Sequence, residues 1–223
     1  MGETGHSGLF ITFEGVEGSG KSTQAERLAR ALTERGFEVV LSREPGGTPL
    51  GERIRELLLD RAETGMEPVA ELMLFLASRA EHVARTIVPA LGRGAVVISD
   101  RYADASVAYQ GGGRRLGVDL VDRLNDSATG RVKPDVTFLV DVAPATGQRR
   151  KARGADAPDR IEEETLAFHE RVRDAYLELA AREPERFVVV DGERDPDTVA
   201  DEILGRTEDL LETRRIGRGE GRT

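Results

Sequence analysis

The sequence predicts an α/β protein built on a five-stranded parallel sheet with helices on both faces. Short apolar runs alternate with longer segments of helical periodicity, which is the order that produces parallel sheets. The apolar runs show no polar alternation, as is typical of strands covered on both faces. The five expected strands are Leu9–Glu14, Phe37–Ser42, Ala95–Ser99, Val136–Val140 and Phe187–Val190.

The first elements follow one another closely. The run Leu9–Glu14 (LFITFE) ends at a glycine, and Lys21–Arg35 follows with apolar residues at helical spacing. Gly36 is a candidate for the glycine that closes this helix, and the strand Phe37–Ser42 comes next. Strand, glycine loop, helix and strand in this order form the beginning of a parallel sheet.

The rest of the chain continues the alternation of helices and strands. Pro49–Leu59 is expected to form a short helix, and Pro68–Leu91 a long one with Pro89 near its end. The third strand, Ala95–Ser99, is fully apolar until its last residue. Later helices are expected at Pro144–Arg153, Glu162–Arg182 and Pro196–Thr213.

Composition limits the class of protein. With 223 residues, of which 39% are hydrophobic, the chain suits one domain, expected over residues 1–213, followed by a disordered basic tail at 214–223. The net charge of −9 disfavours nonspecific nucleic-acid binding, and without cysteine there are no disulfides or thiolate metal sites. No signal peptide and no apolar run of ~18 residues is present, so we expect a cytoplasmic protein without membrane contact.

Acidic residues follow three of the expected strands. Glu14, Asp100 and Asp141 each stand at or just after the end of an apolar run. Because parallel strands end at the same edge of a sheet, these carboxylates are expected to share one rim with the glycine loop. Ligands of open α/β sheets bind at this rim, so we expect the functional site there.

The glycine loop fits the pattern G-x-x-x-x-G-K-[ST] at every fixed position. Its glycines let backbone N–H groups face a phosphate, and the helix that follows adds its positive N-terminal dipole. Lys21 is expected to bridge the β- and γ-phosphates of ATP, and Ser22 to ligate Mg²⁺. The residues expected to bind the nucleotide are Gly15, Val16, Glu17, Gly18, Ser19, Gly20, Lys21, Ser22 and Thr23.

The loop alone leaves several classes of nucleotide-binding protein open. A GTPase needs a guanine-reading N-K-x-D segment, but the single asparagine, Asn125, is followed by Asp126 and Ser127. A short domain with additional acid and arginine motifs points to a small-molecule kinase. A regulatory module that binds ATP without phosphorylating a small molecule is the alternative from another class.

Further motifs give the sequence a specific resemblance. REPGGT (residues 43–48), DRYADASVAYQGGG (100–113) and DRIE (159–162) accompany the loop EGVEGSGKST and the helical segment LFLASRAEHV. Together they resemble the thymidylate kinase family from about Leu9 to about Leu211. The resemblance implies a P-loop nucleoside monophosphate kinase fold with a short lid, a homodimer, and ATP-dependent phosphorylation of dTMP to dTDP with Mg²⁺. A kinase for UMP or a purine monophosphate is the nearest alternative.

The resemblance assigns the residues that handle phosphate. It implies that Arg101 grips the acceptor phosphate, which suits the forked geometry of a guanidinium. Arg43 is implied as a second phosphate contact. Asp100 is implied as the acid that organises Mg²⁺ and its waters; a structural helix cap is the alternative for this residue.

Two residues of the long helix are implied as contacts of the base. Phe75 and Arg79 lie four residues apart, and therefore on one face of that helix. In the family this phenylalanine stacks on thymine and this arginine hydrogen-bonds to its edge. The spacing by itself would place Phe75 in the core beside its leucine neighbours.

Four other positions match residues around the acceptor nucleoside. Ser106 takes the place of a polar residue that faces the base, and Gln110 is expected near the base. Tyr109 matches the aromatic residue that closes off the 2′ side of the sugar and favours deoxyribose. Glu17 matches a carboxylate that approaches the 3′-hydroxyl, which explains an acid inside a phosphate loop.

The basic segment 148–160 (QRRKARGADAPDR) corresponds to the lid of the family. Thymidylate kinases place an arginine for the transition state either in the P-loop or in the lid, and this P-loop has none. The resemblance therefore implies a lid arginine, with Arg153 preferred and Arg149 or Arg150 as alternatives. Arg160 is expected to pair with a carboxylate. Taken alone, the segment is typical of a solvated charged loop.

Overall fold

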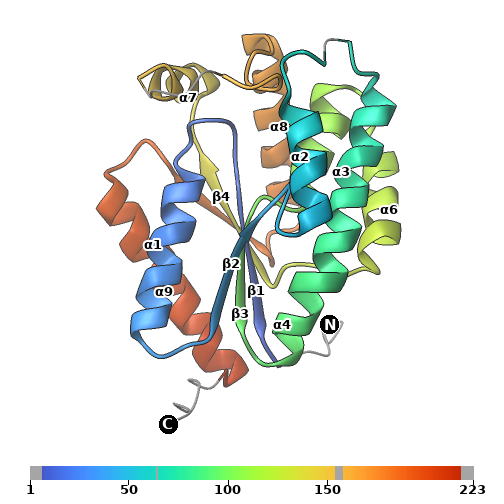
Figure 1. Ribbon diagram of the computed structural model, residues 1–223. Helices are drawn as coiled ribbons and strands as arrows, with labels where there is room; N and C mark the ends of the chain where they lie inside the picture. Colours follow the sequence, from blue (N-terminus) through green and yellow to red (C-terminus); the bar gives the residue numbers. More distant parts are fainter. Residues whose placement is uncertain (1–6, 64, 154–157, 217–223) are drawn as a thin grey trace.

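Five parallel strands form a single sheet in the computed structural model, which describes residues 7–63, 65–153 and 158–216 (Figure 1). The strand order is β2-β3-β1-β4-β5, so the first strand lies in the centre. The fold class expected from the sequence is confirmed. The strands are β1 (Leu9–Glu14), β2 (Val39–Arg43), β3 (Val96–Asp100), β4 (Val136–Asp141) and β5 (Phe187–Asp191).

Helices cover both faces of the sheet (Figure 1). α1 and α9 pack on one face, and α3, α6 and α8 lie over the other with the wide-turn segment η2. The helical segments before β4 are α1 (Lys21–Glu34), α2 (Pro49–Leu59), α3 (Pro68–His82), η1 (Val83–Ile87), α4 (Val88–Gly92), α5 (Ala103–Ser106), η2 (Val107–Gly113) and α6 (Val118–Thr129). Those after β4 are α7 (Pro144–Lys151), α8 (Leu166–Arg182) and α9 (Pro196–Arg214).

Burial differs between the central strands and the edge strands. Nearly every residue of β1, β3 and β4 is buried, as expected for strands covered on both faces. The edge strands differ, because Leu41 in β2 and Val189 in β5 are 45% and 48% exposed. The helices cover the middle of the sheet and leave part of each edge open.

The expected long helix 68–91 is divided into three parts. α3 ends at His82, a wide turn spans Val83–Ile87, and α4 completes the run. The backbone N–H of Val88 bonds to the carbonyl of Val83, five residues earlier. Pro89 has no N–H to donate, and it follows directly on the wide turn, where the regular hydrogen-bond pattern of the α-helix is already interrupted.

Three helical segments between β3 and β4 were not expected from the sequence: α5, η2 and α6. η2 contains three consecutive glycines, which disfavour a helix in isolation, yet it packs firmly against α8. α6 begins after Gly117, and its many polar residues weaken the periodic signal. Tertiary packing therefore overrides local preference at η2 and α6.

The C-terminal helix extends slightly further than expected. α9 includes Arg214, and Ile216 packs against the core between the sheet and helices α1 and α9. The expected disordered tail at 214–223 therefore begins with residues that belong to the helix end, and residues 217–223 lie outside the described part of the chain. No helix in the described ranges has the length and apolarity needed to cross a membrane.

The glycine loop and the lid helix meet backbone to backbone. A Cβ on Gly18 would lie 2.2 Å from the carbonyl oxygen of Gly147, and a Cβ on Gly147 would lie 2.1 Å from the carbonyl oxygen of Glu17. Gly18 also has a φ of +70°, which disfavours other residues. Only glycine at both positions allows the first turn of α7 to lie this close to the loop.

Candidate functional site

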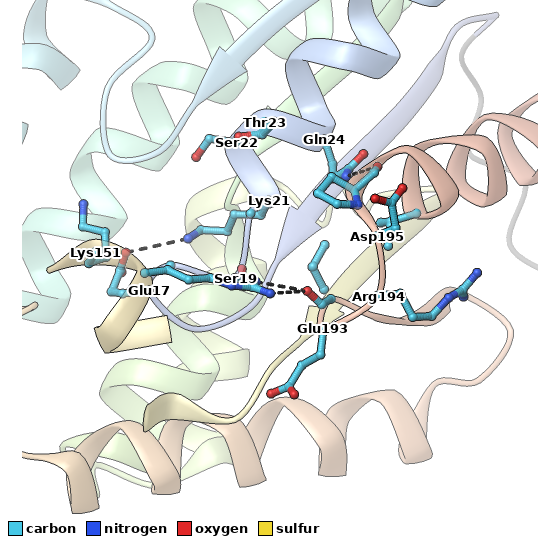
Figure 2. A pocket seen from close by; sticks show the side chains of 17 residues that line it. Glu17, Ser19, Lys21, Ser22, Thr23, Gln24, Lys151, Glu193, Arg194 and Asp195 are labelled. Atoms are coloured by element: carbon cyan, nitrogen blue, oxygen red, sulfur yellow. Dashed lines mark hydrogen bonds and ion pairs between the residues drawn. The ribbon is translucent and has the colours of Figure 1, made fainter. Parts of the chain in front are cut away.

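The glycine loop borders a cavity of about 690 Å³ beyond the carboxyl end of β1, the donor cavity (Figure 2). Of the residues expected to bind the nucleotide, Gly15 and Val16 do not border it, and Val16 packs in the core. Seven others do: Glu17, Gly18, Ser19, Gly20, Lys21, Ser22 and Thr23. Figure 2 shows Glu17 and Lys151 toward one end of this cavity and Glu193, Arg194 and Asp195 toward the other.

Two opposite charges face each other inside the loop. The Lys21 Nζ lies 3.7 Å from the Glu17 Oε2, and both side chains are largely buried. Burial acts to raise the pKa of Glu17, but the positive charges of Arg101 and Lys21 outweigh it and lower that pKa to about 2. Glu17 is therefore ionised at neutral pH and compensates the positive charge around the loop.

Ser22 and Asp100 lie together at the start of α1 and the end of β3. The Ser22 hydroxyl donates a short hydrogen bond to the Asp100 Oδ2. The other carboxylate oxygen, Oδ1, is buried and has no hydrogen-bond partner among the described residues. No cluster of three or more acidic or histidine side chains that could hold a metal occurs in residues 7–63, 65–153 and 158–216. A hydroxyl and one carboxylate fit Mg²⁺, which takes few protein ligands and completes its shell with phosphate and water.

A second cavity of about 190 Å³, the acceptor cavity, lies beside the first between β3, α2, α3 and η2. It contains most of the residues expected to bind the acceptor. Those residues are Glu17, Arg43, Phe75, Arg101, Ser106, Tyr109 and Gln110. Phe75 also packs against the core, so the two interpretations of this residue are compatible.

Arg101 is held rigidly at the border of the acceptor cavity. Its guanidinium donates to the Gly15 carbonyl and the Tyr176 hydroxyl (3.1 Å each), to the Tyr109 hydroxyl (2.9 Å) and to Glu17. It also lies over the Tyr109 ring, 4.7 Å from its centre. Its φ of +72° is unfavourable for arginine, and such backbone strain is often retained at functional sites.

Arg79 is the one expected acceptor residue that does not border the acceptor cavity. Its side chain is 1% exposed and donates to Glu44, Ser106, Asn125 and the carbonyl of Tyr102, at 2.6–3.0 Å. Glu44 and Ser106 do border the cavity. Arg79 thus supports the floor of the cavity from beneath, and its contact with the base remains a prediction.

The lid arginines differ in position. Arg150 borders the donor cavity and donates twice to the Gly192 carbonyl (3.0 Å each). Arg149 bonds to Thr146 within its own helix, and Arg153 is exposed and borders neither cavity. Arg160 pairs with the buried carboxylate of Glu71 at 2.8 Å. The arginine preferred from the resemblance, Arg153, therefore does not border the donor cavity in this structure, and its role stays a prediction.

Lys151 was not among the lid residues expected at the site, which were all arginines. It borders both the donor and the acceptor cavity, and its ammonium pairs with Glu162 at 2.7 Å. The hydrogen bond to Glu162 raises the pKa of Lys151, so the side chain stays positively charged. The run of basic residues in the sequence gave no periodic signal to separate Lys151 from its neighbours.

Two other contributors were missed from the sequence. Arg55 on α2 borders the acceptor cavity near Arg43, and its position about two helical turns after REPGGT was the available signal. The loop after β5 forms the far wall of the donor cavity. That loop contributes Gly192, Glu193, Arg194, Asp195 and Pro196.

Glu14 is buried directly beneath the site. It accepts hydrogen bonds from the Tyr102 N–H (2.7 Å) and the Tyr176 hydroxyl (2.6 Å). Burial and the nearby Asp104 raise the pKa of Glu14 to about 8, although Arg101 acts in the opposite direction. Glu14 is therefore largely protonated at neutral pH and adds little negative charge beneath Arg101.

Glu14→Gln should change how stability depends on pH. Between pH about 4.5 and about 8 the unfolded chain has released a proton that the native Glu14 retains, so native stability falls as pH rises through this window. The variant lacks this contribution, and its free energy of unfolding should rise relative to that of the natural protein across the window. Urea unfolding at several pH values measures this, with Glu178→Gln on the exposed face of α8 as control. Equal pH slopes for both proteins would contradict a protonated Glu14.

Comparisons with known proteins agree with this geometry. The thymidylate kinase family model matches residues 13–203, which include both cavities. The thymidylate kinase of Geobacter sulfurreducens is 49% identical over 208 residues, covering 89% of this chain and 98% of the relative. That of Solidesulfovibrio magneticus is 50% identical over 209 residues, covering 91% and 100%.

A solved structure is similar over the same range. The crystal structure of thymidylate kinase from Ehrlichia chaffeensis has a TM-score of 0.73 and 36% identity to this chain. The match covers 90% of this chain and 98% of that one. The chain belongs to the thymidylate kinase family.

Proposed function

We propose that this protein transfers the γ-phosphoryl group of ATP to dTMP, giving ADP and dTDP, the immediate precursor of dTTP. The adjoining donor and acceptor cavities carry the proposal. Among the described residues, four border both cavities: Glu17, Lys21, Ser22 and Lys151. A phosphoryl group that passes from one ligand to the other has to cross this shared border. A regulatory module that binds ATP without phosphorylating a small molecule has no need of a second cavity there.

The donor phosphates are held by the loop and the start of α1. Backbone N–H groups of the loop and the helix N-terminus attract the phosphates, and Lys21 adds a buried positive charge. Arg150 and the loop after β5 border the part of the cavity farther from Lys21, where the nucleoside is expected. ATP is the phosphoryl donor implied by membership of the family.

Mg²⁺ is proposed as the cofactor, held by Ser22 and Asp100. The orphaned Oδ1 of Asp100 and the adjacent hydroxyl supply oxygen ligands without a third protein group. When bound, the ion neutralises phosphate charge and orients the γ-phosphoryl group. Asp100 needs no role as a proton acceptor, because the acceptor phosphate is already ionised near pH 7.

The acceptor is positioned by arginines and aromatic rings. Arg43, Arg55 and Arg101 border one cavity, and their forks suit a phosphate. Phe75 offers a ring face to the base, and Tyr109, fixed by Arg101 and Glu17, closes the cavity beside the sugar. A ribose 2′-hydroxyl would therefore meet a rigid wall.

Lys151 is proposed as the lid cation that stabilises the transferring group. It is the single lid residue of the described part of the chain that borders the donor and acceptor cavities together with Lys21. Charge builds on the equatorial oxygens during transfer, and a positioned ammonium lowers its energy. Glu162 holds Lys151 at this border by a 2.7 Å ion pair.

A panel of monophosphates tests the reaction itself. ATP-dependent ADP release should be fastest with dTMP and much slower with UMP, GMP and AMP, because the base and sugar walls fit a thymine deoxynucleotide. A coupled ADP-release assay with each acceptor measures this. Preference for another base, or ADP release that ignores the acceptor, would remove the proposal.

Lys151→Ala should lower kcat about 100-fold or more while changing the KM for dTMP only slightly, because the charge acts on the transition state. Steady-state kinetics with varied dTMP and ATP measure the two effects separately. Arg149→Ala, on the same helix and bonded to Thr146, is the matched control and should stay near the natural rate. A large rise in KM at unchanged kcat would instead make Lys151 a substrate-binding residue.

A homodimer and a cytoplasmic location are also proposed. α2 and α3 pack together and expose apolar side chains, each 42–54% exposed: Leu50, Leu57, Val69 and Met73. Such a patch on adjoining helices suits a second copy of the chain.

Met73→Glu should convert the dimer to a monomer in light scattering after size exclusion, whereas Val189→Glu on the sheet edge should not. A natural protein that is monomeric at high concentration would contradict the assembly.

A further inference from the structure

A third cavity, of about 380 Å³, lies between the lid helix α7 and the first turn of α8. Glu17 and Lys151 border it as well as the donor and acceptor cavities, so it adjoins the point where those two meet. Its walls are largely apolar and include Val16, Pro144, Ala152 and Pro158. The phosphoryl-transfer reaction leaves this space without a role.

One buried side chain of this cavity lacks hydrogen-bond partners. His169 borders the cavity and is 2% exposed, and neither ring nitrogen makes a hydrogen bond to any described residue. The backbone carbonyl of Glu162 lies near the ring but forms no bond of normal geometry. The other buried histidine, His82, differs, because its nitrogens pair with Glu44 (2.9 Å) and Ser42 (2.7 Å). Buried polar groups are normally paired, so His169 points to a missing partner.

The charges around the cavity exclude an anionic occupant. Glu17 and Glu162 contribute two carboxylates, and the ammonium of Lys151 is already paired with Glu162. Burial lowers the pKa of His169, so its ring is neutral and offers one donor and one acceptor. A phosphate or carboxylate would meet net negative charge, whereas an uncharged ring would meet apolar walls.

We propose that this cavity binds a small, uncharged aromatic nitrogen heterocycle, which forms a hydrogen bond with one ring nitrogen of His169 while its rings pack on the apolar walls. Benzimidazole and the free purine bases belong to this class. The occupant would contact the stem of Lys151 and so restrain the lid cation. This effect on turnover rests on the proposed function, but binding itself does not.

Benzimidazole is the probe, added above neutral pH to the full chain saturated with dTMP and a non-hydrolysable ATP analogue. Calorimetry should show one site per chain, and imidazole ¹⁵N spectra should show shifts of the His169 signals without shifts of those of His82. In kinetic assays benzimidazole should lower kcat while leaving the KM values for dTMP and ATP nearly unchanged. Benzoate, an anion of similar size, should not bind.

His169→Phe keeps the approximate shape and the apolar contacts of the ring and should weaken benzimidazole binding about tenfold, the loss expected for one hydrogen bond. Ala152→Trp, at an exposed position on the border of the cavity, should abolish benzimidazole binding because the indole fills the cavity. This second variant tests the proposal even if His169→Phe does not fold. Equal affinity in all three proteins, or competition with dTMP or ATP, would overturn the proposal. Binding without any effect on kcat would overturn only the coupling to Lys151.

Discussion

One guanidinium connects most of the parts that make up this site. Arg101 follows the last residue of β3, and its four hydrogen bonds reach the glycine loop, η2 and α8. These partners lie up to 86 residues from Arg101 in the sequence, as the bond to Gly15 shows. The left-handed backbone at Arg101 is tolerated because so many partners fix the side chain. This residue therefore connects the loop rigidly to the acceptor cavity, together with the hydrogen bond from Tyr109 to Glu17.

The same guanidinium also determines the electrostatics of the site. Glu17 stays ionised because Arg101 and Lys21 lie beside it, whereas Glu14 keeps its proton because burial outweighs the attraction of Arg101. Two carboxyl groups near the same cation therefore carry different charges. A negative charge remains where the acceptor sugar is proposed to bind, and little is added beneath the phosphates.

The sequence predicted the sheet well because its strands are apolar and β-rich, and the five expected strands differ from the observed ones by at most two residues. It did not predict η2 or α6, whose glycines and polar residues depend on packing against α8 and α3. Most of the residues that motif matching assigned to the acceptor lie around one cavity. Motif matching could not show that the N–H groups of Arg79 donate to buried partners. Nor could it show that Lys151 borders both cavities whereas Arg153 borders neither, because no sequence pattern gives the direction of side chains in a charged segment.

The contact between Gly18 and Gly147 has a mechanical consequence. Since the first turn of α7 rests directly on the backbone of the glycine loop, that end of the lid helix is a fixed pivot. Any lid movement must increase along α7 away from Gly147, so Lys151, one turn further on, travels while the root of the helix stays still. A ligand that shifts the glycine loop would therefore change the tilt of α7 directly. The glycine loop and the lid helix are thus connected without any intervening side chain.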